Sequence, residues 1–372
     1  MNWLLAILSV LALDAAVFWL LLRRRNIHIW FLPWLRRQLF GPFARPRVLH
    51  VVLADHWEPY YQQVARAHAH ERVRRWIEGY EQLAPKHRDG RGRHPVHSYF
   101  YPVEEYDEEI LDRLAEHCRR GFGDVEIHLH HDNDTHDHTR DTLANFARLL
   151  HRRHGLLRQR DGRPVYGFIH GNWALDNSRP DGRWCGVDDE IDALLQSGCV
   201  YDMTLPSAPS DTQTRRINSI YWTREDGRPR SHEHGRDARV GASGSSDELL
   251  MIQGPLGLNL RNRKAGIMPR VDGGEISADA PPDETRVALW VDAGVHVIGA
   301  PEHVFVKLYT HGLQEKNLEA FFDQGVLDRL YTSLEEYCAR HGIDLRYETA
   351  WEMYQAILSL IEGREPERRV YS

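Results

Sequence analysis

Cysteine is scarce in this chain of 372 residues, and its placement argues against two common roles. The four cysteines, Cys118, Cys185, Cys199 and Cys338, lie far apart and form no C-x-x-C pair. The pattern therefore indicates neither a disulfide framework nor a zinc site built on thiolates. Widely spaced thiols fit a reducing compartment.

The sequence also lacks an excess of positive charge. Its 47 lysines and arginines are outnumbered by 54 aspartates and glutamates, which gives a formal net charge of -7. Because nucleic-acid binding needs cations that neutralise phosphates, no nucleic-acid partner is expected. The chain shows no internal repeat and no low-complexity tract, and 42% hydrophobic residues are enough for a sizeable core.

Histidine, by contrast, is abundant, with 23 residues in the chain. With so many histidines, the presence of any one is weak evidence for a functional site. The position of a histidine relative to strands and carboxylates has to identify the functional ones. The densest run is VEIHLHHDNDTHDH, residues 125–138, with five histidines and three aspartates directly after a short apolar stretch.

One long apolar stretch occupies residues 3–22 and is broken only by Asp14. Twenty helical residues reach about 30 Å, so we predict a transmembrane helix and assign residues 1–25 to a membrane anchor. A cleaved signal peptide would need a basic start and a small-residue cleavage site, which are missing. The arginines at 23–25 follow the stretch, which favours a single-pass inner-membrane protein of bacterial type with a cytoplasmic main body.

Residues 26–46 combine Trp30, Phe31 and Trp34 with Arg36 and Arg37. This composition suits a juxtamembrane segment in the headgroup layer of a membrane. A linker packed against the folded domain fits the same residues equally well.

From residue 47 to residue 362 the pattern is that of strands alternating with helices. Because this succession is typical of parallel strands with helical crossovers, we expect an α/β fold, either an open sheet or a distorted (β/α) barrel. Residues 223–283, rich in Gly, Pro, Asp and Arg, are expected to be an irregular insertion. The predicted strands include residues 47–57, 96–102, 125–129, 164–171, 200–207 and 303–312, and the predicted helices include 107–121, 139–155, 187–198 and 350–363.

Polar side chains gather where four of these strands end, in ADHWEP, EIHLHHDND, FIHGNW and KLYTHG. In parallel α/β folds the carboxyl ends of the strands carry function, so a common site is expected. Imidazoles and carboxylates around a divalent cation make a hydrolytic site, for which Asp55, His130 and Asp134 are the candidate ligands. Two alternatives stay open: Asp55 as a helix cap, and His128 as a core histidine.

The order of these motifs resembles the polysaccharide deacetylase superfamily, whose members remove N-acetyl or related acyl groups from sugars on a distorted (β/α) barrel. Asp55 and His56 are similar to its first motif of paired acids, and SYFYP is similar to its aromatic strand. EIHLHHDND is similar to its metal-binding histidine motif, FIHGNW to its third motif and LYTH, ending at His311, to its last. The resemblance spans residues 47–312.

The resemblance implies a role for each residue. Asp55 and His56 would share the general base and metal-binding roles, His130 and Asp134 would bind the metal, and His311 would protonate the leaving amine. A register shifted by two residues, with His128 and Asp132, has the same spacing; His130 and Asp134 keep the offset from Glu126. The oxyanion would lie near the three residues His170, Asn172 and Trp173.

The expected cofactor is a divalent metal, and aspartate in place of a ligand histidine favours manganese, magnesium or iron over zinc. The expected substrate is a carbohydrate, which a membrane tether with a cytoplasmic body suggests is lipid-linked or nucleotide-linked. Two other functions fit the same sequence: a glycoside hydrolase using carboxylates such as Glu58, Asp176, Asp188 and Asp189, and a non-catalytic membrane-tethered protein that binds a glycan or a partner.

Overall fold

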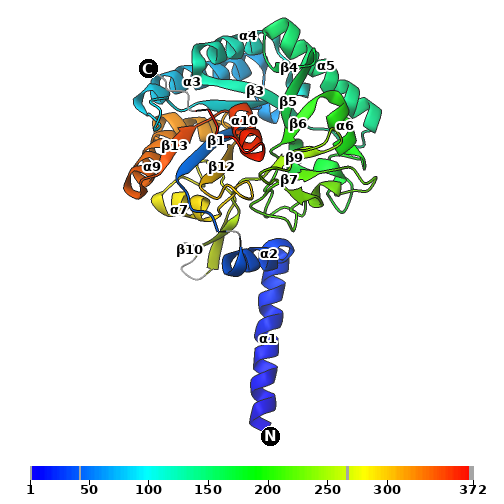
Figure 1. The fold of residues 1–372 in the computed structure, drawn as a ribbon, viewed down its shortest axis with the longest axis vertical. Coiled ribbons are helices and arrows are strands. Elements are labelled where there is room, and N and C mark those ends of the chain that lie inside the picture. Colours follow the sequence, from blue (N-terminus) through cyan, green and yellow to red (C-terminus); the bar gives the residue numbers. More distant parts are fainter. Residues whose placement is uncertain (1, 42, 265–267, 368–372) are drawn as a thin grey trace.

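A large, mostly parallel sheet organises the computed structural model, which describes residues 2–41, 43–264 and 268–367 (Figure 1). Its strands are β1 (Val48–His56), β2 (His97–Pro102), β3 (Gly123–Leu129), β4 (Arg158–Arg160), β5 (Arg163–His170), β6 (Cys199–Asp202), β7 (Ile220–Thr223), β8 (Arg236–Asp237), β9 (Leu249–Ile252), β12 (His303–Thr310) and β13 (Asp344–Tyr347). They run in the order β12-β1-β2-β3-β5-β6-β9-β7-β8, with β13 beside β1 and β4 beside β5.

The strands from β12 to β9 pair in parallel, and β4, β7 and β8 add antiparallel edges. The expected α/β fold with parallel strands is therefore confirmed. In the described part of the chain no ladder joins β12 to β8, so the sheet is open rather than a hydrogen-bonded closed barrel. The expected barrel is corrected to a curved open sheet, because β7 and β8 continue the sheet at the edge where a barrel would close.

Helices cover both faces of the sheet. They are α1 (Asn2–Arg24), α2 (Ile27–Phe40), α3 (Arg66–Leu83), α4 (Glu108–His117), α5 (His136–His154), α6 (Glu190–Ser197), α7 (Glu284–Asp292), α8 (Glu315–Leu318), α9 (Val326–His341) and α10 (Ala350–Ile361). In Figure 1, α3, α4 and α5 follow the rim of the body, whereas α10 lies across β1. The sheet thus separates two apolar cores.

Strand β1 shows how the sequence assigns residues to these cores. Leu49, Val51 and Leu53 belong to the core that also contains apolar residues of α3, α4, α5, α6, α7 and α9; we call this side the outer face. Val52 and Ala54 belong to the core built with α10, which we call the inner face. Successive strand residues point to opposite faces, so β1 can be buried on both.

Helix α1 covers the apolar run of residues 3–22 and projects away from the body (Figure 1). Within the described ranges, no helix combines the length and the hydropathy that a bilayer crossing requires. The predicted transmembrane helix is therefore wrong. Asp14 lies in the middle of the run, where a carboxylate costs about 2.5–3.5 kcal/mol in a bilayer.

Helix α2 packs against the folded body. Trp30 is fully buried in a small apolar cluster with Ile217 and Leu256. Arg37 donates hydrogen bonds to the carbonyls of Ala293 and Gly294, at 3.2 Å and 2.8 Å. Of the two interpretations of residues 26–46, these contacts match the segment that packs on the domain.

The segment 223–283 contributes to two sheets. Strand β9 pairs with β6 and β7 in the main sheet, so this part of the segment is structural rather than peripheral. Strands β10 (Gly257–Lys264) and β11 (Met268–Asp272) form a separate antiparallel hairpin beside α2 (Figure 1).

Candidate metal centre

The four polar strand ends lie along one edge of the sheet, as the parallel strands require. The register pairs Asp55 of β1 with Thr310 of β12, and Leu129 of β3 with His170 of β5. The residues that follow these strands, His130 and His311 among them, continue from the same edge.

The pleat of the strands divides these side chains between the two faces. His56 and His128 stand on the inner face, with imidazole centroids 4.9 Å apart. Asp55 points to the outer face, where its Oδ2 lies 2.9 Å from Nε2 of His97. His170 follows Phe168 onto the outer face as well. Two separate clusters result.

The inner cluster consists of His56, Glu58 and His128. All three side chains are buried, and their ligand atoms lie within 4.8 Å of one another, close enough to hold one metal ion. Two imidazoles and one carboxylate are a ligand set that catalytic zinc sites use, with a further position left for water or substrate. The residues therefore fit a divalent cation.

His128 is prepared for metal binding by the backbone of the neighbouring strand. Its Nδ1 lies 2.7 Å from the carbonyl oxygen of Ile169, which can only accept, so Nδ1 carries the hydrogen. The lone pair is then on Nε2, which is buried and has no hydrogen-bond partner among the described residues. Ligand histidines in metal sites are oriented in this way. The alternative of a satisfied core histidine does not fit this unpaired nitrogen.

His130 stands beside the cluster. Glu104 contacts its Nδ1, and its Nε2 lies 3.5 Å from Oε1 of Glu58. Burial acts to lower the pKa of His130, but the hydrogen bond and charge of Glu104 raise it above its usual value. His130 is thus a titratable group at the edge of the cluster, oriented by a carboxylate.

Burial favours the uncharged forms of the basic side chains on the inner face. Burial lowers the pKa of His56 well below its usual value, and His311, His128 and Lys307 lower it further. Burial also lowers the pKa of Lys307, to about 7, although Asp202 acts in the opposite direction. Neutral imidazole is the form that binds a metal.

Aromatic rings and His311 border the cluster. The imidazole of His311 lies 4.6 Å from that of His56, centroid to centroid. Trp173 contacts both histidines, with centroid distances of 6.2 Å to His56 and 6.3 Å to His311. The predicted acid His311 and the predicted pocket residue Trp173 therefore lie next to the inner cluster.

Asp55 lies behind the inner cluster. Its Oδ1 accepts a hydrogen bond of 2.7 Å from the backbone N–H of Gly312, directly after His311. Gly312 has no room for a side chain, because a Cβ there would lie 2.2 Å from Oδ2 of Asp55. Asp55 thus fixes the turn that carries His311 and does not join the ligand set with His56.

The outer cluster consists of His131, His170, Cys185 and Glu190, and Asp134 stands behind His131. The carboxylate of Asp134 lies 3.1 Å from Nδ1 of His131 and 2.7 Å from Nδ1 of His138. The predicted ligand set Asp55, His130 and Asp134 is thus spread over three places. Asp132 of the alternative register accepts a hydrogen bond from the backbone of Trp184.

The remaining predicted residue, Asn172, sits in the turn after β5 with φ of 53°, a left-handed conformation that asparagine tolerates better than most residues. A further cluster in the described chain, made by Glu302, His303 and Glu365, lies at the opposite end of the strands and includes an exposed carboxylate.

Several site residues were missed by sequence reasoning. Glu104 follows the aromatic strand, and the polar strand-end pattern could have identified it; Glu58 was considered, but only as a carboxylate for glycoside hydrolysis. Cys185 and Glu190 lie in a loop and at a helix start with no motif of their own, so only the folded chain reveals them.

The carboxylates considered for glycoside hydrolysis do not gather around Glu58. Asp176 faces His232, 3.2 Å from its Nδ1, and Asp188 accepts a hydrogen bond of 2.6 Å from Asn177. A large surface hollow of about 1170 Å³ lies elsewhere, at the amino ends of β5 and β6. Because function in such folds gathers at the carboxyl ends of strands, the inner cluster is the better candidate site.

Comparison with known proteins yields no match, either to a protein-family model or to a curated protein. The resemblance to polysaccharide deacetylases therefore stays a prediction that rests on the motifs of this chain.

Proposed function

We propose that this protein is a metal-dependent hydrolase that removes an N-acyl group from a sugar, with His56, Glu58 and His128 as metal ligands. The observation that carries the proposal is the buried Nε2 of His128, which makes no hydrogen bond within the described chain and lies 3.5 Å from Oε1 of Glu58 while Ile169 fixes its tautomer. The resemblance of the motifs to those of polysaccharide deacetylases is the reason for proposing that the amide bond of an N-acyl group is hydrolysed.

The ligand set narrows the cofactor. A divalent cation held there would supply Lewis acidity, which activates a water molecule and polarises an acyl carbonyl. Two imidazole nitrogens and a carboxylate suit zinc, and also manganese or iron, better than magnesium, which prefers oxygen ligands.

Residues around the ligands provide the proton transfers. Because Glu104 accepts the hydrogen of Nδ1, neutral His130 carries its lone pair on Nε2, 3.5 Å from Oε1 of Glu58, where it can take a proton from the attacking water. His311, beside His56, is placed to give a proton to the leaving amine. Asp55 acts as a positioning residue, since it orients the turn after His311 through the N–H of Gly312.

An aromatic ring beside the ligands suits a sugar substrate. Trp173 stands next to both His56 and His311, so its ring can pack on the apolar face of a pyranose while polar groups face the ligands. Whether that sugar belongs to a polysaccharide or to a lipid-linked glycan depends on contacts beyond the acyl group.

Acetate release tests the proposal. Purified protein loaded with zinc or manganese is incubated with N-acetylglucosamine oligomers, and free acetate is measured. We expect release that a chelator abolishes, that added metal restores and that His128→Ala eliminates. As a matched control, His68→Ala on the exposed side of α3 should keep activity.

The result has two contrary outcomes. Acetate release by His128→Ala at the wild-type rate would remove this cluster from catalysis. A protein that binds metal at His128 but releases sugar instead of acetate would be a glycoside hydrolase, and the proposed acyl chemistry would be wrong.

A further inference from the structure

The outer cluster brings the ligand atoms of two histidines, a cysteine and a glutamate close to one point. The ligand atoms of His131, His170, Cys185 and Glu190 lie within 4.8 Å of one another. Nε2 of His131 is 2.8 Å from Nε2 of His170 and 3.0 Å from Oε1 of Glu190. The four side chains come from three segments: the turn after β3, the end of β5, and the loop that leads into α6.

Both histidines are held with their Nε2 atoms toward this point. Nδ1 of His170 lies 2.6 Å from the carbonyl oxygen of Gly171, so Nδ1 carries the hydrogen. Nδ1 of His131 is 3.1 Å from the carboxylate of Asp134, which Thr139 fixes in turn with a hydrogen bond of 2.9 Å. A carboxylate behind an imidazole is the arrangement that orients histidine ligands of zinc.

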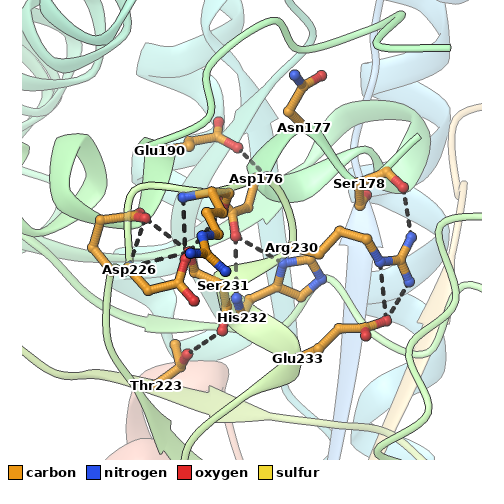
Figure 2. A network of polar contacts seen from close by, with 12 residues as sticks. Asp176, Asn177, Ser178, Glu190, Thr223, Asp226, Arg230, Ser231, His232 and Glu233 are labelled. Carbon is orange, nitrogen blue, oxygen red and sulfur yellow. Dashed lines mark hydrogen bonds and ion pairs between the residues drawn. The ribbon is translucent and has the colours of Figure 1, made fainter. Parts of the chain in front are cut away.

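Cys185 and Glu190 are arranged to carry negative charge. The sulfur of Cys185 accepts backbone N–H groups from Asn177, at 3.3 Å, and from Val187, at 3.5 Å. Oε2 of Glu190 accepts the N–H of Asp176 at 2.6 Å (Figure 2), and Oε1 lies 3.0 Å from Nε2 of His131. Both side chains are fully buried, where an anion needs a cation beside it.

The chain is also folded closely around this point. The N–H of Asp134 donates a hydrogen bond of 3.0 Å to the carbonyl of Cys185, which ties the loop to the turn after β3. Gly186, with φ of 93°, allows the contact, because a Cβ there would lie 2.9 Å from the backbone of Asn133 and Asp134.

We propose that His131, His170, Cys185 and Glu190 bind a structural zinc ion, separate from the inner cluster. Two imidazoles, a thiolate and a carboxylate complete a tetrahedral shell with no position left for water, as in structural zinc sites. The thiolate favours zinc over manganese and magnesium. On binding, the thiol proton of Cys185 passes to solvent. The ion would join the turn after β3 to the loop before α6.

Cobalt(II) substitution tests the site with a readout that is independent of catalysis. Of the two clusters, only the outer one contains a thiolate, and a thiolate bound to cobalt(II) gives a charge-transfer band in the near ultraviolet. Metal-stripped full-length protein titrated with cobalt(II) should develop this band, and zinc should displace it. Cys185→Ser should lose the band, whereas Cys199→Ser, which removes another buried thiol, should keep it.

Metal content completes the test. The wild-type protein isolated without chelators should contain zinc, and Cys185→Ser and His170→Ala should each contain one equivalent less. His128→Ala should keep the cobalt band, so loss of the proposed catalytic metal leaves this inference intact. If a variant fails to fold, the wild-type spectrum still decides: a cobalt(II) spectrum without a thiolate band overturns the site.

Discussion

The inner and the outer cluster stand at the same edge of one sheet, yet they differ in the number of ligand residues and in what surrounds them. The inner cluster offers three ligands, with His130, His311 and Trp173 beside them. The outer cluster offers four and is closed by the loop of Cys185. The comparison teaches that histidine-rich strand ends can supply two sites of opposite character, one on each face.

The cause is the two-residue period of a strand. His128 and His130 stand on one side of β3, and His131 starts the turn that leads to the other side. A one-residue slip in the register would exchange the histidines of the inner face with those of the outer face. The register of β3 against β5 therefore determines which histidine joins which cluster.

The largest expected effect is on activity. His128→Ala should lower kcat/KM by about 10³-fold or more, because several kcal/mol of transition-state stabilisation depend on the metal. The melting temperature should fall by less than in a variant of the outer cluster, because the outer cluster remains intact. Steady-state kinetics and thermal denaturation of one preparation check both; a large loss of stability with activity retained would reverse the assigned characters.

The next largest effect is on stability. Cys185→Ser should lose the stabilisation by the outer metal, about 4 kcal/mol when free metal is about 1,000 times its dissociation constant. At about 2 °C per kcal/mol for a large domain, the melting temperature should fall by about 8 °C. Chelation should lower the melting temperature of the wild type by at least as much and that of Cys185→Ser by less, because the variant has only the proposed inner metal to lose. Equal melting temperatures of wild type and variant in zinc would contradict a structural role.

Asp134→Asn tests whether Asp134 binds the metal itself or only orients the ligand His131. Because Asp134 holds His131 from behind, the substitution should weaken zinc binding at the outer cluster by about 10–100-fold without abolishing it. Competition with a chromogenic zinc chelator measures the change. Complete loss of the site would make Asp134 itself a ligand, as the sequence suggested.

Asp55→Asn tests the division between the faces. Removal of a general base costs about 10²–10⁴-fold in rate. Asparagine can still accept the N–H of Gly312, so a positioning role predicts a loss of less than about tenfold, with metal content unchanged. A loss of 10³-fold or more would return Asp55 to the catalytic set.

Asp107 belongs to neither cluster, and its substitution measures the size of an ordinary stabilising contact. It caps α4; burial acts to raise its pKa, but hydrogen bonds from Arg66, Tyr60 and His70 lower it well below the usual range. The stabilisation is therefore present above the unfolded pKa of about 4 and is lost as the pH falls through the folded one. Asp107→Ala should cost about 1 kcal/mol at pH 7 and less at pH 3, measured by urea denaturation. A gap that stays constant over this range would contradict the linkage.

Much of the fold follows from the sequence, because strands such as residues 47–57 and 125–129 are short apolar runs, and the second is followed by a helix that Thr135 caps. The meeting of the strand ends also follows from parallel pairing. The allocation to faces follows too, since Asp55 and His56 are neighbours on a strand and cannot share a site by their side chains. The motif comparison obscured this point, because it treated the pair as one unit.

Other features depend on contacts that no local pattern contains. Cys185 lies more than fifty residues after His131, and its spacing to histidine matches no zinc motif. Only the close approach of two loops, which Gly186 permits, brings them together. Asp14 is a different case, because the sequence itself shows that a charged residue interrupts the apolar run of residues 3–22. This interruption argues against the predicted transmembrane helix.

The pairing of β1 with β12 has a consequence for synthesis. Val48 to Asp55 pair with residues from His303 onward, about 250 positions later, so His56 and His311 meet only when nearly the whole chain has left the ribosome. The ligands of the outer cluster all lie between residues 131 and 190, so they can assemble while the rest is still being made. We therefore expect the nascent protein to capture its structural ion first and its catalytic ion last.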